Sequence, residues 1–285
     1  MILQKFEEAA KEKKSNIGIG LGDSEYHNNK ILKASLNFLE TQNSSVFIFG
    51  KKSSVNKIRE QMQISNIKLQ LKFIECQEPE KSIFEYLLNK SINSIVRGSI
   101  SSTKFLKNLK IYLNSREINR LALLETYNNY QFFYGPVGID ECNNLEKKIK
   151  FLELAVRELN EINIIPKISV LSGGRISDTG RDAKVDKTIQ DANKIVEIMR
   201  KRFVNITITH DEILIEKAIE NKSNLIIAPD GISGNLIYRT LVHLGGGKAY
   251  GAIYMGLKHT IIDTSRVSDI SEIHGALLLA LALSK

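Results

Sequence analysis

The segment Leu225-Ile-Ile-Ala-Pro-Asp-Gly-Ile-Ser-Gly-Asn235 passes from a short apolar run, through a polar turn, into a helical pattern. This order is typical of one strand and the helix that follows it in a parallel sheet. The same alternation recurs along the chain, and it predicts an α/β fold with a mostly parallel sheet. The expected strands are 16–19, 46–49, 71–74, 94–96, 120–124, 168–171, 205–207, 225–227, 252–255 and 259–263.

The bulk composition is that of a folded protein. The chain has 285 residues, of which 42% are hydrophobic and 25% charged, so global disorder is excluded. A net charge of +8 would suit a nucleic-acid surface. However, the whole excess lies in residues 51–120, which contain 14 Lys+Arg against 6 Asp+Glu. Such dispersed charge predicts solvated helix faces, so we expect no nucleic-acid partner.

Several other classes of protein are not expected. Cys76 and Cys142 lack a zinc-like spacing, so no metal site is predicted. The longest apolar run, 276–283, is far shorter than the roughly 20 residues of a spanning helix, and the N-terminus lacks a signal-peptide pattern. We therefore expect a cytoplasmic protein without a membrane partner. His210 and Asp211 are expected to be exposed polar residues rather than a catalytic pair.

Polar residues follow many of the expected strands, where ligands bind in open α/β sheets. The first such loop, Gly18-Ile-Gly-Leu-Gly22, could hold a phosphate on backbone N–H groups, although it departs from G-x-G-x-x-G and a tight turn also explains it. The second contains Arg97 and Gly98 with Ser101 and Thr103. The guanidinium of Arg97 suits phosphate or carboxylate, and the hydroxyls of Ser101 and Thr103 could cap a helix.

Three later loops also follow expected strands and contain polar residues. The loop 172–182 contains two glycines, two arginines and two aspartates, more than a simple turn requires. The segment 228–239 departs from G-x-S-x-G, which argues against hydrolase chemistry of the nucleophile-elbow kind. The segment 262–269 places a hydroxyl beside a guanidinium, a combination that suits an oxyanion.

The order of these motifs resembles that of known families. Arg97-Gly98, Gly234-Asn235 and Ser265-Arg266 are similar to motifs of the phosphate acetyl/butyryltransferases. More specific strings resemble the methanogenesis marker protein 4 family, also called methyltransferase-related subunit X, whose members are described as methyltransferase subunits of methanogens. These strings are Gly135-Pro-Val-Gly-Ile-Asp-Glu141, Leu171-Ser-Gly-Gly-Arg175, Ala228-Pro-Asp-Gly-Ile-Ser-Gly-Asn235 and Asp263-Thr-Ser-Arg266.

The resemblance implies a two-domain fold like those of isocitrate dehydrogenase and phosphotransacetylase, with an interdomain cleft. We expect one domain at 1–135 plus 260–285 and another at 136–259, with a loop at 134–144 between them. It also implies a homodimer. In the acyltransferases a CoA thiol attacks an acyl phosphate, and an Asp shortly after the Ser-Arg pair is the proposed base. Here Asp269 and Glu272 are both available, with Asp230 as another candidate.

The expected function is that of a transferase-like protein of methanogens, associated with a methyltransferase, which binds a small anionic ligand that is phosphate-bearing or CoA-like. The alternatives are a non-catalytic subunit of a methyltransferase complex and a phosphate acyltransferase. The loops 135–138 and 173–182 depart from the acyltransferase pattern, so methyl, acyl and phosphoryl transfer all stay open. The expected catalytic residues are Ser265, Arg266, Asp230, Asn235 and Asp269. The expected ligand-binding residues are Gly20, Arg97, Gly98, Ser101, Thr103, Gly173, Gly174, Arg175, Asp178, Arg181, Gly234 and Arg239.

Overall fold

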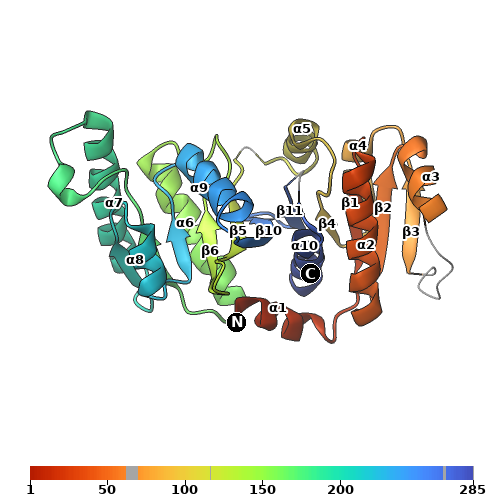
Figure 1. The fold of residues 1–285 in the computed structure, drawn as a ribbon, viewed down its shortest axis with the longest axis horizontal. Helices are drawn as coiled ribbons and strands as arrows, with labels where there is room; N and C mark the ends of the chain where they lie inside the picture. The colour runs from red at the N-terminus through yellow and green to blue at the C-terminus, as the bar shows by residue number, and fades with distance from the viewer. Residues whose placement is uncertain (62–69, 116, 266–267, 285) are drawn as a thin grey trace. The chain divides into compact units, whose positions relative to one another are not determined.

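A computed structural model gives the fold, and it describes residues 1–61, 70–115, 117–265 and 268–284 (Figure 1). The chain divides into two compact units. The first unit comprises Leu3–Ile118 and Ala249–Lys285, and the second comprises Met1–Ile2 and Asn119–Lys248. No helix among the described residues is long and apolar enough to span a membrane.

The first unit is built on a mostly parallel sheet. Its strand order is β3-β2-β1-β4-β11-β10, in which only β10 runs antiparallel to its neighbour β11. The strands are β1 (Asn16–Gly20), β2 (Ser45–Gly50), β3 (Leu71–Glu75), β4 (Ser94–Val96), β10 (Lys248–Tyr254) and β11 (Thr260–Asp263). Burial on both faces explains why these strands are apolar runs rather than alternating ones.

Helices cover both faces of this sheet. Helix α2 packs against α3 and α10, and α4 packs against α5 over a core that includes Phe84 and Phe105. Apolar residues recur every three to four positions in these segments, which gives each helix an apolar face for packing. The helices are α1 (Ile2–Ala10), α2 (Glu25–Thr41), α3 (Lys52–Gln61), α4 (Pro79–Leu88), α5 (Ser102–Tyr112) and α10 (Ile270–Ala282).

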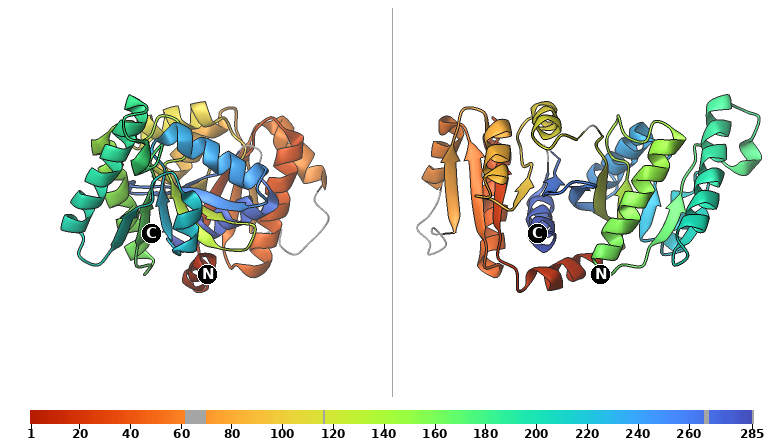
Figure 2. Two further views of the ribbon diagram at one scale, coloured as in Figure 1. Left: turned by 60° about the vertical axis from the view of Figure 1, so that its left-hand side comes forward. Right: turned by 180° about the vertical axis from the view of Figure 1, so that it is seen from behind.

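The second unit has its own strand order, β5-β6-β9-β7-β8. Strands β5 (Arg120–Glu125) and β6 (Gln131–Gly135) form an antiparallel hairpin, and the other pairs are parallel. Helix α6 lies beside α7 (Figure 2). The remaining elements are β7 (Lys167–Val170), β8 (Thr207–His210), β9 (Leu225–Ile227), α6 (Leu145–Glu161), the 3₁₀ helix η2 (Ile176–Asp178), α7 (Ala183–Arg202), α8 (Ile215–Glu220) and α9 (Gly231–His243).

The α/β fold with a mostly parallel sheet is confirmed, but one strand was not expected. The predicted loop at 134–144 is wrong at its start, because Tyr134 and Gly135 complete β6. The strand consists of the run Gln131-Phe-Phe-Tyr-Gly135, which is buried throughout. A continuous apolar run without alternation cannot be assigned by periodicity alone.

The unit boundaries fall at 118/119 and 248/249 rather than at the expected 135/136 and 259/260. The pairing of the hairpin explains the first difference. Strand β6 forms parallel pairs with β9 while β5 pairs with β6, so both strands belong with the second unit.

Candidate functional site

The carboxyl ends of five strands of the first unit meet at one edge, because β1, β2, β3, β4 and β11 are parallel. The chain moves from β1 to β2 and β3 on one side, then crosses to β4 on the other. Open α/β sheets bind ligands at such a reversal of strand order. A cavity of about 270 Å³ lies here, lined by residues that follow four of these strands, among them Gly22, Ser24, Lys51, Ser101 and Lys104.

Most residues that line the cavity are polar, and they carry both signs of charge. The Nζ of Lys51 lies 3.0 Å from a carboxylate oxygen of Asp23, and this hydrogen bond raises the pKa of Lys51. Lys104, in the first turn of α5, is exposed and has no ion-pair partner among the described residues. Ser24 and Ser101 cap helices α2 and α5. The cavity therefore presents a lysine, hydroxyls and helix N-termini, although the carboxylates Glu78 and Glu80 also line it.

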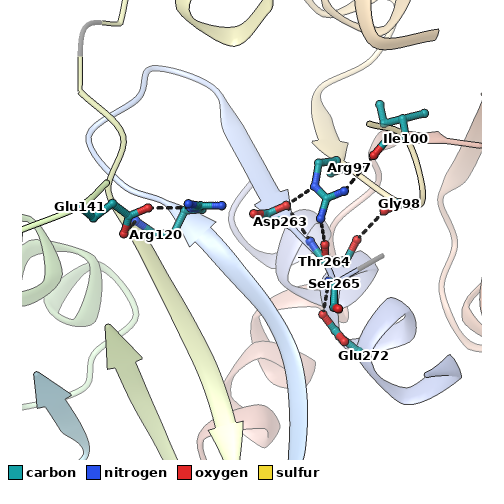
Figure 3. Close-up of polar contacts among 9 residues, drawn as sticks. All are labelled: Arg97, Gly98, Ile100, Arg120, Glu141, Asp263, Thr264, Ser265 and Glu272. Carbon is teal, nitrogen blue, oxygen red and sulfur yellow. Dashed lines mark hydrogen bonds and ion pairs between the residues drawn. The ribbon is translucent and has the colours of Figure 1, made fainter. Parts of the chain in front are cut away.

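Arg97 joins the end of β4 to the end of β11 (Figure 3). Its Nε donates to Asp263, its Nη2 donates to the carbonyl of Thr264, and its Nη1 donates to the carbonyl of Ile100 at 2.9 Å. The residue is only 4% exposed. These bonds give Arg97 a positioning role, since they fix the loop after β4 against the segment after β11. A direct contact of Arg97 with a ligand stays a prediction.

Gly98 permits the close approach of these segments. Its φ is +67°, and a Cβ at this position would collide with the carbonyl oxygen of Gly20. Its own carbonyl accepts a hydrogen bond of 3.0 Å from the hydroxyl of Thr264. The expected glycines Gly20 and Gly98 thus have a packing role that brings the loops after β1, β4 and β11 together.

Glu272 lies in the first turn of α10 and is 4% exposed. Its Oε1 accepts a hydrogen bond of 2.7 Å from the backbone N–H of Ser265 (Figure 3). Burial raises the pKa of Glu272 to about 7; the bond from Ser265 opposes this rise and the nearby Asp263 adds to it. A carboxyl group that titrates near neutral pH is suited to general acid–base chemistry.

Asp269 has a different environment from Glu272. Its side chain is 81% exposed and forms an ion pair of 3.0 Å with Lys30. Of the two carboxyl groups left open by the sequence, Glu272 is the one buried beside Ser265. Arg266 lies outside the described residues.

Two of the family-like strings lie side by side in the second unit, because β6 and β9 are parallel neighbours. The Nδ2 of Asn235 donates to the carbonyl of Val137 at 2.8 Å. A Cβ at Gly234 would collide with the carbonyl oxygen of Pro136, so only glycine allows this approach. Asn235 and Gly234 therefore fix α9 against the loop 136–141.

Asp230 caps helix α9. One of its carboxylate oxygens accepts from the N–H of Ser233 at 2.8 Å and from its hydroxyl at 3.0 Å. Helix capping explains the presence of a carboxylate at this position. The role of Asp230 as a general base stays a prediction. Arg239 lies further along α9 and is exposed.

A buried ion pair in the same unit was not expected from the sequence. Arg120 Nε lies 2.7 Å from Glu141 Oε1, and the side chain of Glu141 is 1% exposed (Figure 3). Burial raises the pKa of Glu141, although Arg120 opposes the rise. The pair holds the start of β5 against the loop after β6.

The loop 172–182 is held mainly by its own polar groups. Arg181 forms an ion pair of 2.5 Å with Asp178, which also accepts from the N–H of Arg175 at 2.9 Å. Both bonds lower the pKa of Asp178. Gly173 donates to the hydroxyl of Thr188 at 2.8 Å. Arg175 and Arg181 are exposed, and a contact of either with a ligand stays a prediction.

The expectation that His210 and Asp211 are exposed is wrong. Asp211 is 2% exposed, and His210 is half-buried. The ring of His210 lies 2.8 Å from both Asn193 Oδ1 and the hydroxyl of Ser172. Burial lowers the pKa of His210, which favours the neutral imidazole. The adjacency of β7 and β8 creates this contact, and no spacing in the sequence predicts it.

Among the described residues, no cluster of three or more His, Cys, Asp or Glu side chains is placed to hold a metal ion. The predicted site residues instead gather at several strand ends. Gly20, Arg97, Gly98, Ser101, Ser265 and Asp269 lie in the first unit, where Ser265 bonds to Glu272 and Ser101 lines the cavity. Thr103 is exposed in the first turn of α5.

Comparisons with known proteins identify relatives of this chain. A Methanosarcina barkeri protein named "Putative methyltransferase mtx subunit X" is 36% identical over 277 residues, which cover 96% of this chain and 95% of the relative. The model of a wider family, described as phosphate acetyl/butaryl transferase, matches residues 85–281. The chain belongs to the mtx subunit X proteins of that family. The resemblance seen in the quoted strings is thereby confirmed.

Solved structures of phosphotransacetylases share the fold. EutD phosphotransacetylase from Staphylococcus aureus aligns with a TM-score of 0.71 at 14% identity, covering 99% of this chain and 97% of that one. A phosphotransacetylase from Streptococcus pyogenes gives 0.70 at 15% identity with the same coverage. The phosphotransacetylase-like fold expected for this mtx subunit X protein is confirmed.

Proposed function

We propose that this chain is a transferase whose first unit binds a phosphate-bearing or CoA-like ligand and uses Glu272 as general base. The observation that carries the proposal is the placement of Glu272, buried beside Ser265 where β4 and β11 end. A base is most effective when its pKa is close to the working pH, and burial raises the pKa of Glu272 to about 7. In the acyltransferases that the chain resembles, the proposed base also follows the Ser-Arg pair.

The cavity beside β1 supports the assignment of an anionic ligand. Lys104 is exposed at its wall, and the capped N-termini of α2 and α5 face the same region. Helix N-termini and lysines both favour phosphate groups. The loop 97–101 links this cavity to the site around Glu272, because Ser99 and Ser101 line the cavity while Gly98 accepts a bond from Thr264.

The proposed reaction joins an acyl group to a thiol. Glu272 accepts the proton of the CoA thiol, and the sulfur attacks the carbonyl carbon of an acyl phosphate. The carbon–sulfur bond forms, the bond between the acyl carbon and the phosphate oxygen breaks, and Glu272 returns the proton to the phosphate, which leaves as hydrogen phosphate. The hydroxyl of Ser265 stabilises the charge that develops on the carbonyl oxygen. Arg266 neutralises the phosphate in this scheme, in line with the Ser-Arg pair of the acyltransferases.

A second candidate is a non-catalytic binding subunit of a methyltransferase. It is favoured by the name of the Methanosarcina barkeri relative, "Putative methyltransferase mtx subunit X". The internal bonds of Asp230 and Asn235 are consistent with this candidate, because two expected catalytic side chains have structural partners.

The activity experiment incubates the full chain with acetyl phosphate and CoA and measures acetyl-CoA. We expect turnover by the wild type and a loss of about 10²- to 10⁴-fold in Glu272→Gln, as is typical for removal of a general base. The matched variant is Asp269→Asn, three residues earlier and exposed, for which we expect a change below about threefold. Equal loss in both variants would contradict the assignment of Glu272.

The binding experiment measures thermal shifts with CoA and with inorganic phosphate. We expect Lys104→Ala to reduce the shift, because it removes an unpaired cation from the cavity wall. Lys107→Ala is the control, since Lys107 is exposed on the same helix but does not line the cavity. If the wild type neither binds CoA nor forms acetyl-CoA, and it co-purifies with a methyltransferase, the second candidate replaces the first.

A further inference from the structure

Another cavity, of about 300 Å³, lies at the edge of the first sheet opposite to the candidate site. It is lined by the residues at or just before the start of β1, β2, β3 and β4, whose amino ends meet because the strands are parallel. We call it the amino-edge pocket. Its lining residues, all in the first unit, are Lys14, Ser15, Asn16, Asn43, Ser44, Ser45, Gln70 and Asn93.

The lining of the amino-edge pocket consists of amides, hydroxyls and one ammonium group. None of the described residues that line it is acidic, aliphatic or aromatic. The cavity at the carboxyl edge differs, because it includes the carboxylates Asp23, Glu78 and Glu80 as well as Leu21 and Pro79. Apolar side chains line most ligand pockets and bind the apolar parts of the ligand. Their absence here indicates a ligand that carries polar groups on every side.

Backbone bonds fix several of these side chains and leave other polar atoms of the same groups unused. Asn93 Oδ1 accepts from the N–H of Asn16 at 2.9 Å, and Asn16 Nδ2 donates to the carbonyl of Ser91 at 3.1 Å. The hydroxyl of Ser44 accepts from the N–H of Ser15 at 3.2 Å. Asn93 Nδ2, Asn16 Oδ1 and the proton of the Ser44 hydroxyl are thereby left for a ligand. Such a mixture of donors and acceptors matches hydroxyl groups, which both donate and accept.

Ser15 has a buried hydroxyl without a partner. The residue lines the amino-edge pocket and is only 5% exposed. Within the described part of the chain, its Oγ forms no hydrogen bond. Buried polar groups of folded proteins are normally hydrogen-bonded. A ligand hydroxyl in the pocket would supply the missing bond.

Lys14 gives the amino-edge pocket its charge. It is exposed, and it forms no ion pair with another described residue. Its neighbour Lys13 differs, because the Nζ of Lys13 donates to the carbonyls of Ala282 and Ser284 at 2.6 and 3.1 Å. Since no described residue of the lining is acidic, a negative group beside Lys14 would be attracted without an opposing repulsion.

We propose that the amino-edge pocket binds a small polyhydroxylated anion, either a sugar acid or a sugar phosphate. The hydroxyls of the ligand bond to Ser15, Asn16 and Asn93, and its carboxylate or phosphate pairs with Lys14. The volume lies at the low end of that of ligand pockets, which suits a molecule of about one sugar unit. The proposal does not depend on the transferase reaction, because the candidate site lies at the opposite ends of the same strands.

The test titrates the full chain with four probes by isothermal calorimetry. The probes are gluconate, glucose 6-phosphate, the neutral polyol sorbitol and inorganic phosphate. We expect gluconate or glucose 6-phosphate to bind with a Kd below about 1 mM, and the tighter of the two identifies the acid group. Sorbitol and phosphate should each bind at least about tenfold more weakly, because each lacks either the charge or the hydroxyls. Absence of binding by both polyhydroxylated anions overturns the proposal, and so does equal affinity for phosphate.

A pair of serine variants separates a binding role from a structural one. Ser15→Ala should weaken the binding of the tighter probe about tenfold through loss of one hydrogen bond. It should not lower the Tm of the free protein, because the hydroxyl has no described protein partner to lose. The matched control is Ser35→Ala, whose hydroxyl is also buried and unpartnered among the described residues but lies on α2 outside the pocket. Equal affinities in the two variants overturn the proposal.

Three lysine variants locate the charge contact. Lys14→Ala should remove the preference for the anionic probe over sorbitol, because no other cation among the described residues lines the pocket. Lys11→Ala should keep that preference, since Lys11 is exposed but does not line the pocket. Lys104→Ala changes the cavity at the carboxyl edge and should leave the affinity unchanged. Loss of binding in Lys104→Ala but not in Lys14→Ala would place the probe at the carboxyl edge and overturn the proposal.

Discussion

Helices α9 and α10 are both 13 residues long and both rich in apolar residues, yet their environments are opposite. In α10 the side chains from Leu277 to Ala282 are all buried, because the helix packs on α2, β4 and β11. In α9 the only buried residues are two glycines. A helix that is apolar on every side is normally covered by other structure. The chain itself covers α10, whereas Ile232 and Leu236 of α9 stay exposed.

The largest expected effect comes from the covered helix. Leu277→Ala removes a side chain that is fully buried in α10, and it should lower the free energy of unfolding by about 3 kcal/mol. Leu236→Ala on α9 should change it by less than about 0.5 kcal/mol, because that side chain is largely exposed. Urea unfolding at low protein concentration measures both values. Equal losses would remove the contrast between the helices.

A smaller effect concerns Glu272, whose carboxyl group is buried in the first turn of α10. Because folding raises the pKa of Glu272 from an ordinary 4.5 to about 7, the folded state binds more protons than the unfolded state between these values. Stability therefore falls as the pH rises through this window. Glu272→Gln should remove this dependence and stabilise the protein by about 2 kcal/mol more at pH 8 than at pH 5. Urea titrations at the two pH values measure the difference, and a constant offset would contradict the buried carboxylate.

The smallest effect compares the first residues of the two helices. Asp230 caps α9 by accepting from the N–H of Ser233, so Asp230→Ala should cost about 1 kcal/mol. Asp269 precedes α10 without a capping bond from its side chain and forms only an exposed ion pair with Lys30. Asp269→Ala should therefore cost a few tenths of a kcal/mol. Thermal unfolding of the two variants side by side tests this order.

The sequence predicted the strands and strand-end loops well because both depend on local patterns. The apolar runs gave β1, β2, β3, β4 and β9 to within a residue or two, and loops after the first four of these strands line the cavity. The aromatic strand β6 was not predicted, because it is buried on both faces and its apolar residues do not alternate with polar ones. Because β6 was not predicted, the expected domain boundary at 135/136 differs from the unit boundary at 118/119.

The partners of the candidate residues could not be predicted in the same way. Arg97 was expected to contact a ligand, and its acceptors Asp263 and Thr264 lie at the end of a strand that becomes its neighbour only in the folded sheet. The sequence left both Glu272 and Asp269 open as the base after the Ser-Arg pair. Only their burial in the folded structure distinguishes them. The contact of His210 with Ser172 also depends on the pairing of two strands. Such contacts are set by topology rather than by spacing.

The bond between Arg97 and Asp263 joins residues that are 166 positions apart, and this has a consequence for synthesis on the ribosome. At about 5–20 residues per second, roughly 10–30 s pass between the emergence of the two residues. During that time the edge of β4 that later pairs with β11 is open, and α10 has yet to cover the sheet. The site around Glu272 is therefore the last part of the molecule to be assembled. A chain that stops early, even one with a complete second unit, leaves the ribosome with an unprotected strand edge and without Glu272.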